Sequence, residues 1–345
     1  MNRLLPGYLW QARVRLAQYL NVPPTRLVFQ TNVSSAINQV AAGITLKSPG
    51  EILLTDHEYG AMHWCWERAA LRMDLSIRTF KLPTMANDPS EIVAAATAAF
   101  TDRTRLFFFS HVLSPTGLVL PAGELCAAAR KRGIVTVVDG AHAPGMIPLD
   151  VSAVNADFYA ANCHKWMLAP NGCGFLAIGA GNDDRLRPLQ VSWGYHSEPG
   201  LKPDDRDAFG STPRTRFLEM EGSKDVSPWL AVPAAIDYQA VIGREAIRAR
   251  MAELTAYARK RVEEIGLKLA TPADPRMHGS LVAWELPKET QPQELRTFLW
   301  DRQIEIPVIE KPDRTLIRIS CHYYTMPEEI DRWIEAMKER RHRSA

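Results

Sequence analysis

The chain has 345 residues, 46% of them apolar, and its 41 basic and 39 acidic side chains leave a formal net charge of +2. This length is sufficient for two domains that share a buried core. The balanced charge does not indicate nucleic acid as a partner, and no run of about 20 apolar residues could cross a membrane. Pro6 interrupts the first residues too early for a signal peptide, so we expect a cytoplasmic protein.

Between residues 10 and 235, short apolar runs alternate with helix-like segments, which is the pattern of a parallel sheet built from βα units. The expected strands are Leu27–Gln30, Glu51–Thr55, Ser76–Lys81, Leu106–Ser110, Ile134–Asp139, Ala156–Ala161 and Gly174–Ile178. The expected helices include Ser34–Gly43, Ala61–Met73, Glu91–Ala99 and Ala122–Lys131. The pattern predicts an α/β fold with a mainly parallel seven-stranded sheet flanked by helices, and a site assembled from strand ends.

Residues 181–230 lack periodicity and are rich in Asp, Arg, Pro and Gly, which predicts an extended excursion over the surface. A long amphipathic helix is expected over residues 231–265, followed by a strand over 280–285, a helix over 293–303, a strand over 316–320 and a final helix from Pro327. We therefore expect a large α/β domain over residues 1–235 and a small α+β domain over residues 236–345.

The five cysteines are scattered: Cys65, Cys126, Cys163, Cys173 and Cys321. They form neither a Cys-x-x-Cys pair nor a Cys/His cluster with the spacing of zinc ligands. We expect reduced thiols and no metal site.

An apolar strand ends in Asp139, and the next strand leads to Asn162-Cys163-His164-Lys165-Trp166. Taken alone, Asp139 would be a turn former or helix cap, and a lysine at a strand end is usually solvated. The flanking His164 and Trp166 instead favour partial desolvation of Lys165, which suits a lysine to imine formation.

A third feature, Asn32-Val33-Ser34-Ser35, lies between a strand and a helix, where amide and hydroxyl groups bind an anion such as phosphate. By itself this is an ordinary helix cap. Pyridoxal 5'-phosphate (PLP) requires all three features: a lysine for the imine, a carboxylate for the pyridine nitrogen and a cradle for the phosphate. Their order along a βα chain predicts PLP as the cofactor, held as a Schiff base on Lys165.

Three blocks carry a resemblance to a known family. They are Asp139-Gly-Ala-His142-Ala-Pro-Gly, Ala156-Asp-Phe-Tyr-Ala-Ala-Asn162-Cys-His164-Lys165-Trp and Gly172-Cys-Gly-Phe-Leu. They resemble the class V aminotransferases, which are fold type I PLP-dependent enzymes, and within them the isopenicillin N epimerase-like branch. That branch includes hercynylcysteine sulfoxide lyases and is related to cysteine desulfurases. The resemblance implies a fold type I PLP-dependent transferase-like architecture.

The resemblance assigns roles to individual residues. It implies that Asp139 pairs with the pyridine nitrogen, that His142 approaches the phenolic oxygen of the ring, and that Tyr59 stacks on the cofactor. Catalytic roles are implied for Lys165, His142 and Tyr59. The other implied cofactor-binding residues are Val33, Ser34, Asn162, His164, Ser114 and Ser223.

Partner and substrate contacts are also implied. Ser223 lies in a segment that in this family reaches the phosphate of the other subunit, so a homodimer is implied. Arg318 matches the arginine that binds the α-carboxylate of the amino-acid substrate, for which a guanidinium fork is suited. Without the resemblance, a surface salt bridge would be the simpler interpretation of Arg318. Trp193 and Tyr195 are the candidate substrate contacts in the irregular segment.

The chain departs from the family in two respects. Family members usually begin with a further segment that carries an Asn-x-Gly-like motif, so either the start is internal or the substrate pocket is built differently. Residues 304–315 contain no cysteine, whereas a desulfurase needs a cysteine nucleophile shortly before the residue that corresponds to Arg318. Persulfide chemistry is therefore disfavoured.

The resemblance implies chemistry at the α-carbon through an external aldimine and a quinonoid. Two reactions remain open. Epimerisation of the isopenicillin N epimerase type needs a second acid on the opposite face of the substrate, for which Tyr59 and His142 are candidates. A carbon–sulfur β-lyase of the hercynylcysteine sulfoxide lyase type needs a leaving group on the β-carbon and a single base. A cysteine desulfurase, an aminotransferase and a non-catalytic PLP-binding protein are less favoured alternatives.

Overall fold

The computed structural model describes residues 4–196, 200–207 and 211–344. The chain divides into two compact units. The first contains Met1–Leu82, Ile92–Val112 and Pro121–Val241, and the second contains Pro83–Glu91, Leu113–Leu120 and Ile242–Ala345. Two short segments, Pro83–Glu91 and Leu113–Leu120, thus belong to the second unit although they precede most of the first unit's second half in the sequence. The predicted single boundary at residues 235/236 does not include them.

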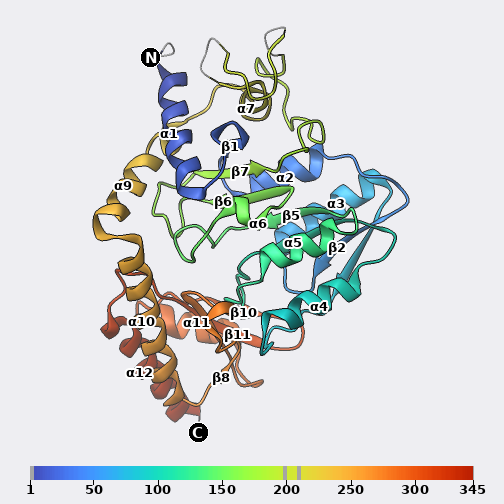
Figure 1. The fold of residues 1–345 in the computed structure, drawn as a ribbon. Helices are drawn as coiled ribbons and strands as arrows, with labels where there is room; N and C mark the ends of the chain where they lie inside the picture. Colours follow the sequence, from blue (N-terminus) through green and yellow to red (C-terminus); the bar gives the residue numbers. More distant parts are fainter. Residues whose placement is uncertain (1–3, 197–199, 208–210, 345) are drawn as a thin grey trace. The chain divides into compact units, whose positions relative to one another are not determined.

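The first unit contains a seven-stranded sheet (Figure 1). Its strands are β1 (Leu27–Gln30), β2 (Glu51–Thr55), β3 (Ser76–Phe80), β4 (Thr104–Ser110), β5 (Val135–Asp139), β6 (Phe158–Asn162) and β7 (Gly174–Ile178), in the order β1-β7-β6-β5-β4-β2-β3. Neighbours from β6 to β3 are parallel, and β7 is antiparallel to both β6 and β1. The predicted mainly parallel sheet is confirmed.

Helices cover both faces of this sheet. One face packs against α2 (Val33–Gly43) and α3 (Gly60–Met73), and their apolar side chains form one core with alternate residues of the strands. On the other face α5 (Ala122–Arg130) packs on β5, where Cys126 lies against Thr136. The remaining helical elements up to residue 242 are α1 (Leu5–Leu20), η1 (Pro24–Arg26), α4 (Pro89–Ala99), α6 (Val151–Val154), α7 (Pro213–Glu219), α8 (Ser227–Leu230) and α9 (Val232–Ile242).

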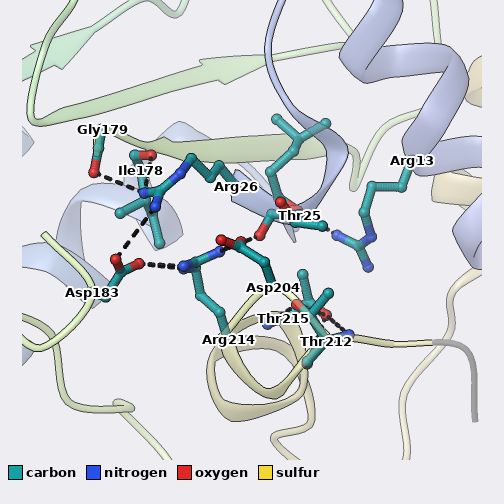
Figure 2. A network of polar contacts seen from close by, with 11 residues as sticks. Arg13, Thr25, Arg26, Ile178, Gly179, Asp183, Asp204, Thr212, Arg214 and Thr215 are labelled. Atoms are coloured by element: carbon teal, nitrogen blue, oxygen red, sulfur yellow. Dashed lines mark hydrogen bonds and ion pairs between the residues drawn. The ribbon is translucent and has the colours of Figure 1, made fainter. Parts of the chain in front are cut away.

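The irregular segment after β7 is fixed to the first unit by one buried guanidinium (Figure 2). Arg214 of α7 donates from Nε to Asp183 at 2.7 Å, and from Nη1 to Asp204 and to the Thr25 carbonyl oxygen, both at 2.6 Å. Arg26 also donates to Asp183, at 3.3 Å. The described part of the expected excursion therefore contains short helices that ion pairs hold in place.

The second unit contains a four-stranded antiparallel sheet in the order β10-β11-β9-β8. Its elements are α10 (Arg244–Glu263), β8 (Lys268–Leu269), η2 (Pro275–Met277), β9 (Leu281–Glu285), α11 (Pro292–Trp300), β10 (Val308–Glu310), β11 (Thr315–Ser320) and α12 (Pro327–Ser344). Where the sequence suggests one helix over residues 231–265, the structure has α9 and α10. Gly243, with φ of 95°, separates them because that backbone conformation cannot continue a helix.

No helix in the described ranges is long and apolar enough to span a membrane.

We expect Arg214→Ala to lower the free energy of unfolding by about 2 kcal/mol, because it removes the buried guanidinium that donates to Asp183, Asp204 and the Thr25 carbonyl oxygen. Urea denaturation of the cofactor-free protein measures this change. The control is Arg250→Ala, since Arg250 forms only an exposed ion pair with Glu253 at 3.0 Å, and the expected loss is below about 0.5 kcal/mol. Equal losses in the two variants would contradict a clamping role for Arg214.

Candidate active site

Polar residues end three neighbouring parallel strands on the sheet face that α2 and α3 cover. Ser110 ends β4, Asp139 ends β5 and Asn162 ends β6. Each continues the row of alternate side chains that contributes to the core beneath α2 and α3. Because the carboxyl ends of parallel strands meet at one edge of a sheet, the three side chains lie together at that edge. All three are buried.

Asp139 is the most deeply buried carboxyl group at this edge in the described chain, with 4% of its surface exposed. Burial raises the pKa of Asp139 above its ordinary value, and a hydrogen bond from the Ala141 amide to Oδ1, at 2.9 Å, opposes the rise. A buried carboxyl group gains most by meeting a positively charged ligand group. Asp139 is therefore suited to bind a protonated ring nitrogen.

Lys165 and His142, which sequence analysis selected from separate motifs, are in contact. The Nζ atom of Lys165 lies 3.1 Å from Nε2 of His142. On the other side of the imidazole, the indole Nε1 of Trp166 donates to Nδ1 of His142 at 3.2 Å. Gln239 of α9 in turn donates to the Trp166 carbonyl oxygen at 2.9 Å. The loop that carries Lys165 is thus tied both to the turn after β5 and to α9.

The indole of Trp166 selects the tautomer of His142. An indole nitrogen can only donate, so Nδ1 of His142 has to accept, and the imidazole proton lies on Nε2. Nε2, which carries the proton, faces Nζ of Lys165 at 3.1 Å. Lysine attacks a carbonyl group in its neutral amine form, with the lone pair of Nζ.

The N-terminus of α2 is the candidate phosphate cradle. Asn32 caps the helix by accepting from the Ser35 amide at 2.8 Å, and Asn162 accepts from the Val33 amide, also at 2.8 Å. A side chain at Gly174 would approach the Asn32 backbone to 2.9 Å, so glycine permits this close packing. The predicted residues Val33 and Asn162 are thus in direct contact. The Val33 and Ser35 amides already donate to side chains, and Ser34 lies between them at the positive end of the helix.

His164 is oriented by the neighbouring strand. Its Nδ1 lies 2.8 Å from the Cys173 carbonyl oxygen, which can only accept, so Nδ1 carries the proton. Burial lowers the pKa of His164 below its ordinary value. The lowered pKa favours the neutral ring, in which Nε2 is unprotonated.

The structure also reveals residues that sequence analysis missed. Glu58 is buried and accepts hydrogen bonds from Thr55 and Ser110, each at 2.6 Å. His57 is buried and lies 2.7 Å from Asp56. The run Asp56-His57-Glu58 directly follows the buried strand β2, and this position was the available signal in the sequence.

Four predicted residues of the first unit lie at its surface. Tyr59 is the N-cap of α3 and is 56% exposed, and Trp193 is 88% exposed. Tyr195 packs against Phe217 with ring centroids 5.5 Å apart and borders a cavity of about 320 Å³. Ser223 is also exposed.

Ser114 and Arg318 belong to the second unit, where they contact each other. The Arg318 guanidinium donates to the Ser114 hydroxyl at 2.9 Å and to its carbonyl oxygen at 2.5 Å. No carboxylate of the described residues forms an ion pair with Arg318, and burial lowers its pKa to about 10. A partly buried cation without an acidic partner is suited to bind an anionic ligand.

Comparison with known proteins places this site in a family. The class V aminotransferase family model matches residues 7–333. The isopenicillin N epimerase of Streptomyces clavuligerus is 53% identical over 97% of this chain and 85% of its own length. The chain belongs to the class V aminotransferase family. The isopenicillin N epimerase of Amycolatopsis lactamdurans is 51% identical over 98% of this chain and 86% of its own, and the resemblance found in the motifs is confirmed.

More distant relatives carry other activities. The hercynylcysteine sulfoxide lyase of Schizosaccharomyces pombe is 25% identical over 71% of this chain and 61% of its own length. Among solved structures, the cystine C–S lyase C-DES in complex with cysteine persulfide has a TM-score of 0.83 and 24% identity, with 96% of this chain and 86% of that chain covered. A C-DES variant with glycine linked to its PLP cofactor is equally similar. These structures share the fold of this class V family member, which confirms the predicted fold type I architecture.

Replacing Trp166 with phenylalanine removes the only group of that side chain that can donate to His142. We expect the cofactor-free wild-type protein to show His142 protonated on Nε2, and Trp166→Phe to show a mixture of both tautomers. The ¹⁵N chemical shifts of the imidazole report the tautomer directly. Trp66→Phe is the control, because the buried Trp66 indole has no acceptor in the described chain. A proton on Nδ1 of wild-type His142 would contradict the assignment.

Proposed function

We propose that this chain is a PLP-dependent enzyme that acts at the α-carbon of an amino acid, and that it is an epimerase of the isopenicillin N epimerase type. The observation that supports PLP chemistry best is the contact of Lys165 with His142, beside the buried Asp139. The near full-length identity of 53% and 51% to two isopenicillin N epimerases favours epimerisation.

The residues of the first unit fit PLP. Asp139 offers a buried carboxyl group to the pyridine nitrogen, and Lys165 offers an amine for the Schiff base. The N-terminus of α2 offers the Ser34 amide and hydroxyl to the phosphate beside Val33, whose own amide donates to Asn162, and His164 adds a further donor when protonated. When bound, PLP supplies an electron-accepting ring that stabilises negative charge on the substrate α-carbon.

The side chains of this protein would then remove the proton of the substrate α-carbon and stabilise the proton of the pyridine nitrogen. With PLP bound, Lys165 would remove the proton from the α-carbon with the lone pair of Nζ, and His142, 3.1 Å from Nζ, would position that atom. Asp139 would favour the protonated pyridine nitrogen, because a positive charge beside it stabilises its own buried charge. Trp166 keeps His142 in the donating tautomer throughout.

Inversion requires that a proton returns from the opposite face of the substrate. Tyr59 and His142 remain the candidates from sequence analysis, and the buried His57 is an additional one. A carbon–sulfur β-lyase would dispense with this second acid. The lyase alternative is supported by a relative of only 25% identity, so we favour the epimerase.

Arg318 is our candidate for the α-carboxylate of the substrate, and Trp193 and Tyr195 are candidates for its side chain. We also propose a homodimer in which the exposed Ser223 reaches the phosphate of the partner subunit, and a cytoplasmic location. These assignments rest on the family resemblance together with the exposure and charge of the residues concerned.

Lys165→Ala should remove the visible absorption band that the wild-type protein gains with PLP, because alanine cannot form the Schiff base. The absorption spectrum measures this loss. In deuterated water, wild-type protein should exchange the α-proton of isopenicillin N with inversion and release no pyruvate. Release of pyruvate and ammonia from cysteine conjugates would favour the lyase instead, and a colourless wild-type protein would refute PLP binding.

Arg318→Lys should raise KM by roughly tenfold to a hundredfold with a smaller effect on kcat, because lysine cannot form the paired hydrogen bonds of a guanidinium to a carboxylate. Steady-state kinetics with the amino-acid substrate measure both constants. Arg250→Lys, an exposed substitution on α10, is the control. An unchanged KM would exclude Arg318 as the carboxylate-binding residue.

A further inference from the structure

Two buried carboxyl groups lie at the same strand edge. Asp139 is 4% exposed and Glu58 is 7% exposed. Oε2 of Glu58 accepts a hydrogen bond from Oγ of Ser110 at 2.6 Å, and Ser110 is the register partner of Asp139 across β4 and β5. Since adjacent strands are separated by about 4.8 Å, the Ser110 side chain that donates to Glu58 lies beside Asp139.

Few charges surround this pair. Glu58 accepts from the hydroxyl groups of Thr55 and Ser110 and also interacts with the Ser110 backbone amide, and no Lys, Arg or His of the described chain forms an ion pair with it. The titratable groups near Asp139 are Lys165, His111 and Tyr159. Burial lowers the pKa of His111 to about 4 and raises that of Tyr159, so both are neutral around pH 7.

Two carboxylates this close in a buried setting cannot both ionise without a cost in free energy. Burial raises the pKa of Glu58 to about 7, although the hydrogen bonds from Ser110 and Thr55 favour its ionised form, and the charge of Asp139 adds to the rise. A glutamate with a pKa of about 7 changes its charge around neutral pH. A glutamine at the same position would carry no charge at any pH.

We propose that Glu58 is a positioning residue for Asp139, and that the two carboxyl groups act as a coupled pair that sets the negative charge facing the ring nitrogen of the cofactor. This inference rests on the proposed PLP function. Around neutral pH the pair carries one negative charge, on Asp139, when the ring nitrogen is bound. At higher pH Glu58 supplies a second charge, which holds the proton on the ring nitrogen where it would otherwise dissociate.

The coupling is testable in the cofactor-free protein. Carboxyl ¹³C NMR follows the titration of Glu58, and Asp139→Asn, which keeps the size of the side chain, should lower the Glu58 midpoint by about one pH unit because the like charge is gone. Ser110→Ala, which removes one hydroxyl that favours ionised Glu58, should raise that midpoint. Glu67→Gln, an exposed change on α3, should leave it unaltered. An unchanged Glu58 midpoint in Asp139→Asn would overturn the proposal.

The consequence for the cofactor has its own readout. With PLP labelled at the ring nitrogen, ¹⁵N NMR should show that nitrogen losing its proton at a pH about one unit lower in Glu58→Gln than in the wild type, and Glu58→Asp should restore part of the difference. Identical profiles would mean that Glu58 is only structural. If wild-type protein bound no PLP, the proposed function would fail, while the titration of Glu58 would still decide whether the carboxyl groups are coupled.

Discussion

The parallel pairing of β4, β5 and β6 is the constraint on which the site depends. It brings Ser110, Asp139 and Asn162 to one edge and onto one face, although they lie far apart in the sequence. The same face is covered by α2, whose N-terminus is held by Asn162. The sheet register therefore places an acid, an anion cradle and the loop of Lys165 within one small region, before any ligand contributes.

Much of this arrangement follows from the sequence. The seven strands are short apolar runs that end in polar turns, so their bounds were predicted to within a few residues, and Asp139 and Lys165 stand at conspicuous strand ends. The roles of Trp166 and Glu58 could not be predicted in the same way. Trp166 reads as a core residue until His142 is placed beside its indole, and Glu58 reads as a solvated turn residue until β2 and β4 are paired.

Two groups of side chains in this family member are candidates for proton chemistry. One consists of Trp166, His142 and Lys165, which direct contacts join around the imidazole. The other consists of Asp139 and Glu58, which lie at neighbouring strand ends and accept from Ala141 and Ser110 respectively. The first group lies near the amine, and burial raises the pKa of both carboxyl groups in the second.

The hydrogen bond from Gln239 to the Trp166 carbonyl oxygen connects the loop of Lys165 to a helix that forms later in the chain. α9 follows the irregular segment, and the buried amide of Gln239 finds its acceptor only when that helix has docked. The loop therefore gains this contact only together with α9. A chain that lacked α9 would carry Asp139, His142 and Lys165 and still leave the backbone beside the lysine without its tie to that helix.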